Sequence, residues 1–122
     1  MTDETRKMLE NAGYDVNGAL ARFVNNENLY FMFMKKFKND ENYMKIEGAL
    51  AAENYEEVYS AVHALKSVAG NLGIQDVFEK TVEMLALIKG KSADDNIKEP
   101  AYAIYEELKK GYDKAVGIID TL

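Results

Sequence analysis

The sequence contains no cysteine, and this absence excludes several kinds of chemistry. A chain without thiols forms no disulfide bonds, holds no metal ion through thiolate ligands and has no cysteine nucleophile. Its stability must therefore come from packing alone. We expect a reducing environment and predict a cytoplasmic location.

Long apolar segments and a basic character are also missing. No apolar run approaches the roughly 20 residues that a membrane span needs. Polar and charged residues follow Met1 directly, so we predict no membrane association. The net charge of −6 argues against binding to nucleic acid, because that affinity depends on Lys and Arg side chains that neutralise phosphates. The sequence favours protein partners.

Proline occurs once, and the eight glycines are scattered. Apolar residues recur at spacings of three and four, which is typical of helices rather than strands. A chain of 122 residues, with 48% hydrophobic and 30% charged residues, is long enough for one packed core but not comfortably for two. We therefore predict a single all-α domain over residues 1–122.

Capping residues and glycines divide the chain into helical segments. A capping residue followed three positions later by an acidic one marks the start of a central helix at Asn54 and Glu57, and Gly73 marks its end. The apolar spacing predicts buried positions that include Phe33 and Val82. The other predicted boundaries are an end at Gly13, a cap at Asp15, a segment over residues 29–38, a start near Asn42, an end at Gly90 and a start near Glu99 and Pro100.

The single histidine, His63, lies in the central predicted helix. An α-helix turns about 100° per residue, so positions three, four and seven apart share a face. The apolar residues fall on the side opposite His63, which is therefore predicted to be exposed rather than packed in the core. An exposed histidine without any function is the simple alternative. The residues that share its face are Glu56, Tyr59, Ser60, Lys66, Ser67 and Gly70.

The neighbours of His63 favour a chemical role for it. The ammonium group of Lys66, three residues later, could stabilise phosphate oxygens on a modified ring; the alternative is a lysine that only confers solubility. Ser67 and Gly70 are small, and a glycine inside a helix costs roughly 1 kcal/mol relative to alanine. Gly70 therefore indicates either clearance for a partner or close helix packing. A neutral imidazole, with a pKa of about 6.5, is a nucleophile near pH 7.

The segment HALKSVAGNLG, from His63 to Gly73, resembles the signature of histidine-containing phosphotransfer (HPt) domains. Its matching residues are His63, Lys66, a small residue at Ser67, where the family often has glycine, and Gly73. The segment from Gly13 to Phe37 is similar to the family's N-terminal helices. The resemblance extends to about Lys89, and the final helix matches only in length and amphipathic pattern.

The resemblance implies an antiparallel four-helix bundle with a short extra N-terminal helix. It also implies reversible transfer of a phosphoryl group between His63 and an aspartate of a response-regulator receiver domain. A hybrid histidine kinase is the other implied partner. The HPt domain itself is implied to have no kinase activity of its own. The candidate site is then His63 as phosphoacceptor and Lys66 as phosphate stabiliser. Candidate partner-binding residues are Glu56, Tyr59, Ser60, Ser67 and Gly70.

Other functional classes are less well supported. The sequence has no P-loop or other nucleotide-binding pattern, so an ATP-dependent kinase is not predicted. One histidine and no cysteine leave only carboxylates for a metal, and Asp94 and Asp95 lie in an apparent connector; we expect neither a metal nor a cofactor. The rival hypothesis is a helical adaptor that binds a receiver domain without carrying phosphate. We expect a monomer, either free-standing or part of a larger kinase.

Overall fold

The computed structural model describes all 122 residues and contains α-helices, one short 3-10 turn and no strand. The all-α prediction is confirmed. Three short helices come first. Four helices follow, each at least as long as the longest of the first three, and the 3-10 turn lies before the last of them. Their bounds are α1 (Asp3–Asn11), α2 (Val16–Arg22), α3 (Glu27–Phe37), α4 (Glu41–Ala51), α5 (Tyr55–Leu72), α6 (Gln75–Ile88), η1 (Ala93–Asp95) and α7 (Lys98–Ile119).

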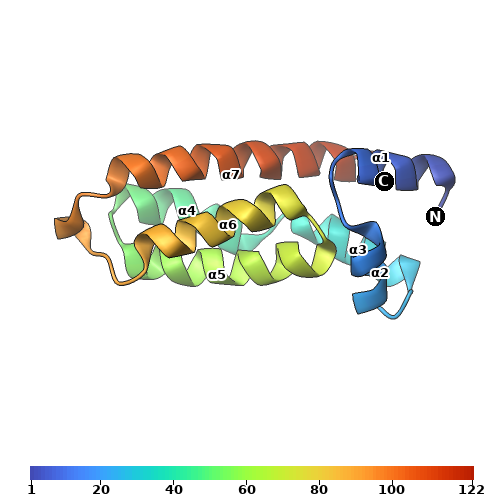
Figure 1. Cartoon of the computed structure of the whole chain (residues 1–122), viewed down its shortest axis with the longest axis horizontal. Helices are drawn as coiled ribbons and strands as arrows, with labels where there is room; N and C mark the ends of the chain where they lie inside the picture. Colours follow the sequence, from blue (N-terminus) through green and yellow to red (C-terminus); the bar gives the residue numbers. More distant parts are fainter.

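The last four helices form the predicted antiparallel bundle (Figure 1). Helix α5 runs opposite to α4, α6 opposite to α5 and α7 opposite to α6, and α5 packs against both α4 and α6. Helix α7 also packs against α4 and α6, so it lies diagonally across the bundle from α5. The helices α1 to α3 gather at one end, close to the end of α7. Three helices precede α4, whereas the family resemblance implies a single short helix before the bundle.

Short polar side chains start five of the helices. In each case the side chain before the first helical residue accepts a hydrogen bond from a backbone N–H within the first turn, a group that has no partner inside the helix. The boundaries predicted at Asp15 and Asn54 are confirmed by this geometry, and the fourth helix begins one residue earlier than expected, at Glu41. The five capping residues are Thr2, Asp15, Asn26, Asp40 and Asn54.

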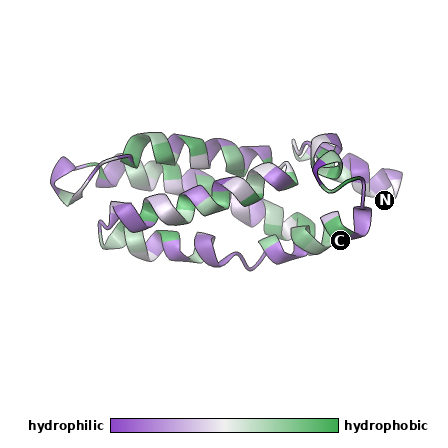
Figure 2. Ribbon diagram, turned by 90° about the horizontal axis from the view of Figure 1, so that it is seen from below, coloured by the Kyte–Doolittle hydropathy of each residue, from purple (hydrophilic) through white to green (hydrophobic).

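One continuous core holds the helices together. Thirty buried hydrophobic residues form a single cluster, which includes Leu65 of α5, Met84 of α6 and Leu108 of α7. Each bundle helix carries both hydrophobic and hydrophilic segments (Figure 2), as expected of helices with one face in the core. Apart from the buried tyrosines, the one buried polar side chain is Thr81, whose hydroxyl donates a hydrogen bond to the carbonyl of Phe78.

Two positions that the apolar spacing predicts to be buried are exposed. Phe33 is 37% exposed and Val82 is 42% exposed. At both positions the packing of the helices leaves more than a third of the residue open to solvent. Phe33 is stacked on Phe23, with ring centroids 5.4 Å apart, and the ammonium group of Lys36 lies 5.1 Å from its ring centre.

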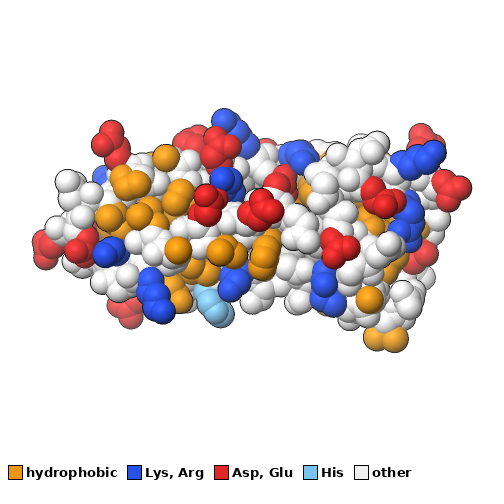
Figure 3. All heavy atoms as spheres, viewed as in Figure 1, with side chains coloured by type: hydrophobic (Ala, Val, Ile, Leu, Met, Phe, Trp, Pro, Cys, Tyr) orange, Lys and Arg blue, Asp and Glu red, His pale blue; other side chains and the backbone are white.

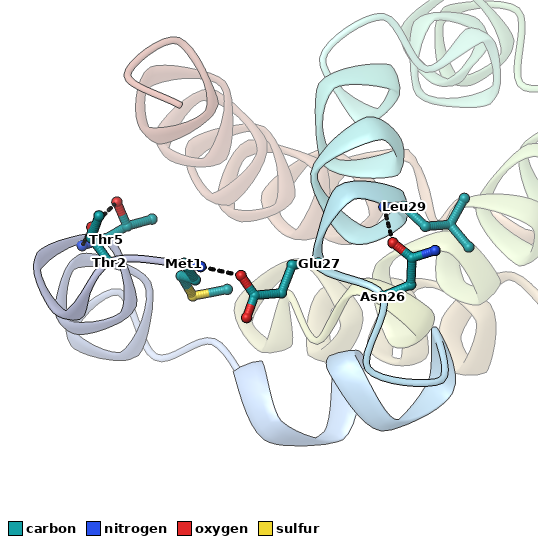
Figure 4. A network of polar contacts seen from close by, with 6 residues as sticks. All are labelled: Met1, Thr2, Thr5, Asn26, Glu27 and Leu29. Carbon is teal, nitrogen blue, oxygen red and sulfur yellow. Dashed lines mark hydrogen bonds and ion pairs between the residues drawn. The ribbon is translucent and has the colours of Figure 1, made fainter.

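Contacts between distant segments attach the N-terminal helices to the bundle. The amino group of Met1 pairs with the carboxylate of Glu27 in the first turn of α3, next to the cap that Asn26 gives Leu29 (Figure 4). At the other end of α1, the ammonium group of Lys114 in α7 donates a hydrogen bond of 2.8 Å to the carbonyl of Ala12.

None of the helices has both the length and the apolar character that a membrane span requires.

Candidate functional site

Helix α5 presents the candidate site and is fixed at both ends. At its start, the side-chain oxygen of Asn54 accepts a hydrogen bond of 3.2 Å from the N–H of Glu57, and the Asn54 amide donates one to the Glu57 carboxylate. The negative charges of Glu56 and Glu57 in the first turn stabilise the helix, because they lie at the positive end of its dipole. At its other end, Gly73 adopts the left-handed conformation, with φ of 70°.

His63 lies in the middle of α5 and is exposed, as the helical angles predict. The single histidine, pale blue in Figure 3, lies on the surface of the molecule. Its imidazole forms no hydrogen bond and no ion pair within the protein, and its nearest aromatic neighbour is Tyr59. The two rings are nearly parallel, with centroids 6.2 Å apart and planes inclined by 21°. Both ring nitrogens are therefore free to bind or react.

The structure brings four of the predicted site residues together. Glu56, Tyr59, Ser60 and His63 line one shallow hollow of about 390 Å³. Glu56, Ser60 and His63 are exposed, whereas Tyr59 is half-buried. This grouping follows from successive turns of one helix, since the four residues lie at steps of three and four. The hollow is open enough for another protein to approach the imidazole.

The other three predicted residues lie outside this hollow, toward the end of α5. Lys66 is half-buried and forms no ion pair. Its ammonium group is therefore available to an anion at the neighbouring imidazole. The exposed Ser67 donates a hydrogen bond of 3.4 Å from its hydroxyl to the backbone carbonyl of His63, so this side chain is turned back toward its own helix.

Gly70 is half-buried because the ring of Phe78 in α6 lies against it. A Cβ atom at this position would lie 3.2 Å from Cε2 of Phe78, which is tighter than an ordinary contact. Close packing between α5 and α6 therefore accounts for this glycine. Of the two explanations that the sequence leaves open for Gly70, the structure favours helix packing over clearance for a partner.

Gly73 is also explained by packing. A Cβ atom on Gly73 would lie 2.4 Å from the backbone oxygen of Asp15, and the N–H of Asp15 donates a hydrogen bond of 2.9 Å to the Gly73 carbonyl. Nearby, the Arg22 side chain donates a hydrogen bond of 3.0 Å to the carbonyl of Asn71, one of the last carbonyls of α5. Helix α2 thus holds the end of the helix that carries His63.

Sequence reasoning missed a second hollow beside the first. It has a volume of about 460 Å³ and lies between the start of α5 and the end of α6, sharing Glu56 and Tyr59 with the hollow at His63. The exposed Lys89 and Lys91 contribute to it, and neither forms an ion pair. The antiparallel pairing of α5 with α6 brings these lysines close to Glu56 and Tyr59. Helical periodicity within α5 alone could not predict that pairing.

The arrangement combines a nucleophile with a nearby positive charge on an accessible face. A neutral imidazole can attack an electrophile without a further general base, because its lone pair is free. A cation beside it stabilises the negative charge that gathers on a transferring phosphoryl group. These features suit acceptance of a phosphoryl group from another protein.

Comparison with known families supports this interpretation. A family model described as Hpt domain matches residues 38–116, which is more than half of the chain. The match begins after the segment Gly13–Phe37 and extends through most of α7, so the final helix matches better than its sequence pattern alone indicates. Searches among curated proteins and among solved structures return no significant match. The chain therefore belongs to the Hpt domain family, and its general role is histidine phosphotransfer of the phosphorelay type.

Proposed function

We propose that this protein carries a phosphoryl group on His63 between aspartates of receiver domains. The observation that supports this most directly is the exposed imidazole in the middle of α5, with both nitrogens free and Lys66 one turn away. Hpt domains interact with receiver domains and with histidine kinases, and they are carriers rather than kinases. A receiver domain and a hybrid histidine kinase are accordingly the proposed partners.

The chemical step is a displacement at phosphorus. A lone pair of the neutral imidazole of His63 attacks the phosphorus atom of an aspartyl phosphate and forms a P–N bond. The P–O bond to the aspartate breaks, and the carboxylate leaves with its electron pair. The other ring nitrogen keeps its proton during the attack, and this proton then exchanges with solvent. The reverse sequence returns the group to a second aspartate.

Lys66 is proposed to stabilise the phosphoryl oxygens in this step. Its ammonium group has no carboxylate partner in the protein, so no ion pair has to be broken before it contacts an anion. A charge-assisted hydrogen bond of this kind forms only when phosphate is present. It therefore acts on the transition state and on the phosphorylated form rather than on the resting protein.

The alternative function is an adaptor that binds a receiver domain on the same face without accepting phosphate. An adaptor has no need of a free imidazole next to an unpaired lysine, and this pair is what favours the carrier. Gly70 does not discriminate between the two, since Phe78 accounts for it. Glu56, Tyr59, Ser60 and Ser67 remain the proposed partner contacts from α5 in both cases.

We further propose that the chain acts as one domain and as a monomer. The thirty buried hydrophobic residues form one cluster that draws on helices from both ends of the sequence. Bundles whose apolar faces turn inward need no second copy to cover them. Light scattering should therefore give the mass of a single chain, and a mass of two chains would contradict this proposal.

Phosphate transfer from a labelled receiver domain tests the proposed function. Purified receiver domains are labelled with radioactive acetyl phosphate, freed of the reagent and mixed with the protein. We expect the label to move to this chain and to be lost in acid but kept in alkali, as for a phosphoramidate. His63→Gln should accept none, while Lys110→Ala serves as the control, because Lys110 is 74% exposed on α7 and lies outside the site. Undiminished labelling of His63→Gln would contradict the proposal.

A further inference from the structure

The site of His63 borders a surface of α6 whose position follows from two fixed contacts. Gly70 of α5 lies against Phe78 of α6, and Tyr59 of α5 lines a hollow together with Lys89, the residue that follows α6. The two helices are antiparallel, so a step back along α5 corresponds to a step forward along α6. These contacts set the register between the two helices along the whole of the site.

The register places Val82 level with Lys66. Four residues before Gly70 is Lys66, and four residues after Phe78 is Val82; each step is about 6 Å along its helix axis and keeps the residue on the same face. Val82 is 42% exposed although it is a β-branched apolar residue. An apolar side chain of the neighbouring helix is thus open to solvent at the level of Lys66, which is about one turn along α5 from His63.

Lysines without partners continue this surface at its other end. Lys89 and Lys91 line the hollow next to Tyr59 and, like Lys66, form no ion pair. The chain as a whole has a net charge of −6, so three unpaired cations around one histidine are contrary to the overall charge. Figure 3 shows basic side chains on both sides of the pale blue histidine, with apolar side chains beside them.

We propose that Phe78, Val82, Lys89 and Lys91, here called the α6 strip, form the second half of the surface that binds the receiver domain. This inference rests on the proposed function and adds the partner's matching chemistry. The receiver domain places an apolar side chain on Phe78 and Val82 and an acidic group at Lys89 and Lys91. Charge complementarity favours this occupant, because a domain that exchanges phosphate at an aspartate presents acidic groups near its reaction site.

The two ends of the α6 strip act on different terms of binding. Burial of Val82 against an apolar side chain contributes mainly to the lifetime of the complex, and this contribution does not depend on salt. Lys89 and Lys91 are exposed, so their attraction for acidic groups speeds association and is screened as the ionic strength rises. Neither end takes part in the chemical step, which belongs to His63 and Lys66.

The rate of transfer from receiver domains labelled with acetyl phosphate, measured over a range of receiver concentrations, tests this inference. Val82→Asp should raise the half-saturating concentration about tenfold or more and leave the maximal rate within twofold. Val82→Leu, which stays apolar, should behave as the unaltered protein. The matched control is Met44→Asp, because Met44 is 59% exposed on α4 and does not belong to the α6 strip.

The lysines are tested in the same assay. Lys89→Glu combined with Lys91→Glu should raise the half-saturating concentration severalfold at low salt and much less at high salt. Lys110→Glu on α7 is the control, since its side chain is 74% exposed and lies on a helix across the bundle. Circular dichroism checks that each variant is folded.

The possible results separate this inference from the proposed function. An unchanged half-saturating concentration for Val82→Asp, with normal labelling of the unaltered protein, overturns the inference and leaves the function standing. A fall in maximal rate alone also overturns it, because the residue would then affect the chemistry rather than docking. Failure of every receiver domain to label the unaltered protein overturns both.

Discussion

The aromatic ring of Tyr59 lies nearly parallel to the imidazole of His63, with centroids 6.2 Å apart. Tyr59 is half-buried, so the core holds it in place, while the imidazole has no hydrogen bond that would orient it. Tyr59 is the aromatic side chain that lies beside the imidazole, and we expect it to favour this orientation of the imidazole. A nucleophile that is already oriented loses less freedom on the way to the transition state.

Tyr59→Ala should slow phosphate transfer to His63 by roughly twofold to tenfold. This range corresponds to the about 0.5–1.5 kcal/mol that an aromatic pair contributes. Single-turnover transfer from a labelled receiver domain measures it. Tyr59→Phe keeps the ring and should transfer at the rate of the unaltered protein. Equal rates for Tyr59→Ala and Tyr59→Phe would show that the stacked ring has no positioning role.

Lys66→Ala should slow transfer by roughly tenfold to a hundredfold without lowering the thermal stability of the protein. The expected loss follows from the value of a charged hydrogen bond, about 1.5–3 kcal/mol, and from the lack of any ion pair that the substitution would break. Lys66→Arg retains the charge and should recover part of the rate. If Lys66→Ala transfers as fast as the unaltered protein, Lys66 does not stabilise the phosphoryl group.

Gly73→Ala should destabilise the protein more than Gly90→Ala. Both glycines have a positive φ, 70° and 69°, so alanine at either position costs about 1–2 kcal/mol for the left-handed conformation. Only at Gly73 would the new Cβ also meet the backbone of Asp15, whereas nothing lies within 4 Å at Gly90. Urea unfolding of the two variants measures the difference. Equal losses of stability would mean that the contact with Asp15 contributes nothing.

The protein should lose stability between about pH 10 and pH 12. Burial raises the pKa of Tyr30 to about 12, and it also raises the pKa of Tyr14 and of Tyr55. An unfolded tyrosine loses its proton near pH 10, so in this interval the folded state binds more protons than the unfolded state. The free energy of unfolding therefore falls as the pH rises, and below about pH 10 the contribution is complete.

Urea unfolding at several pH values, together with tyrosinate absorbance, measures this loss. The hydroxyl groups of Tyr14, Tyr30 and Tyr55 are buried without a hydrogen-bond partner. Tyr30→Phe should therefore be as stable as the unaltered protein at pH 7 and should lose less stability above pH 10. An identical pH profile for Tyr30→Phe would contradict the role of this side chain in the alkaline transition.

Features encoded within one helix were predictable from the sequence. The exposure of His63 follows from helical periodicity alone, because the apolar residues on the opposite side of α5 fix its buried face. The cap at Asn54 is equally local, since the side chain and the N–H that it binds are three residues apart. These interactions require no knowledge of which helices become neighbours.

Features that depend on two helices were not predictable in the same way. The sequence places Gly70 on the outer face of α5 and contains nothing to indicate that Phe78 of the next helix covers it. Val82 has the spacing of a core residue, but the packing of α6 against its neighbours leaves it 42% exposed. The contact of Asp15 with Gly73 joins segments far apart in the chain and depends on the docking of α2.

The freedom of the His63 imidazole has a consequence for how the protein reports its own state. Since no hydrogen bond or ion pair within the bundle involves that ring, a phosphoryl group added there breaks no such interaction and gives the helices no reason to move. Loaded and empty forms would then share one backbone and differ only in charge at a single point. Any partner that tells the two forms apart must do so by sensing that charge directly.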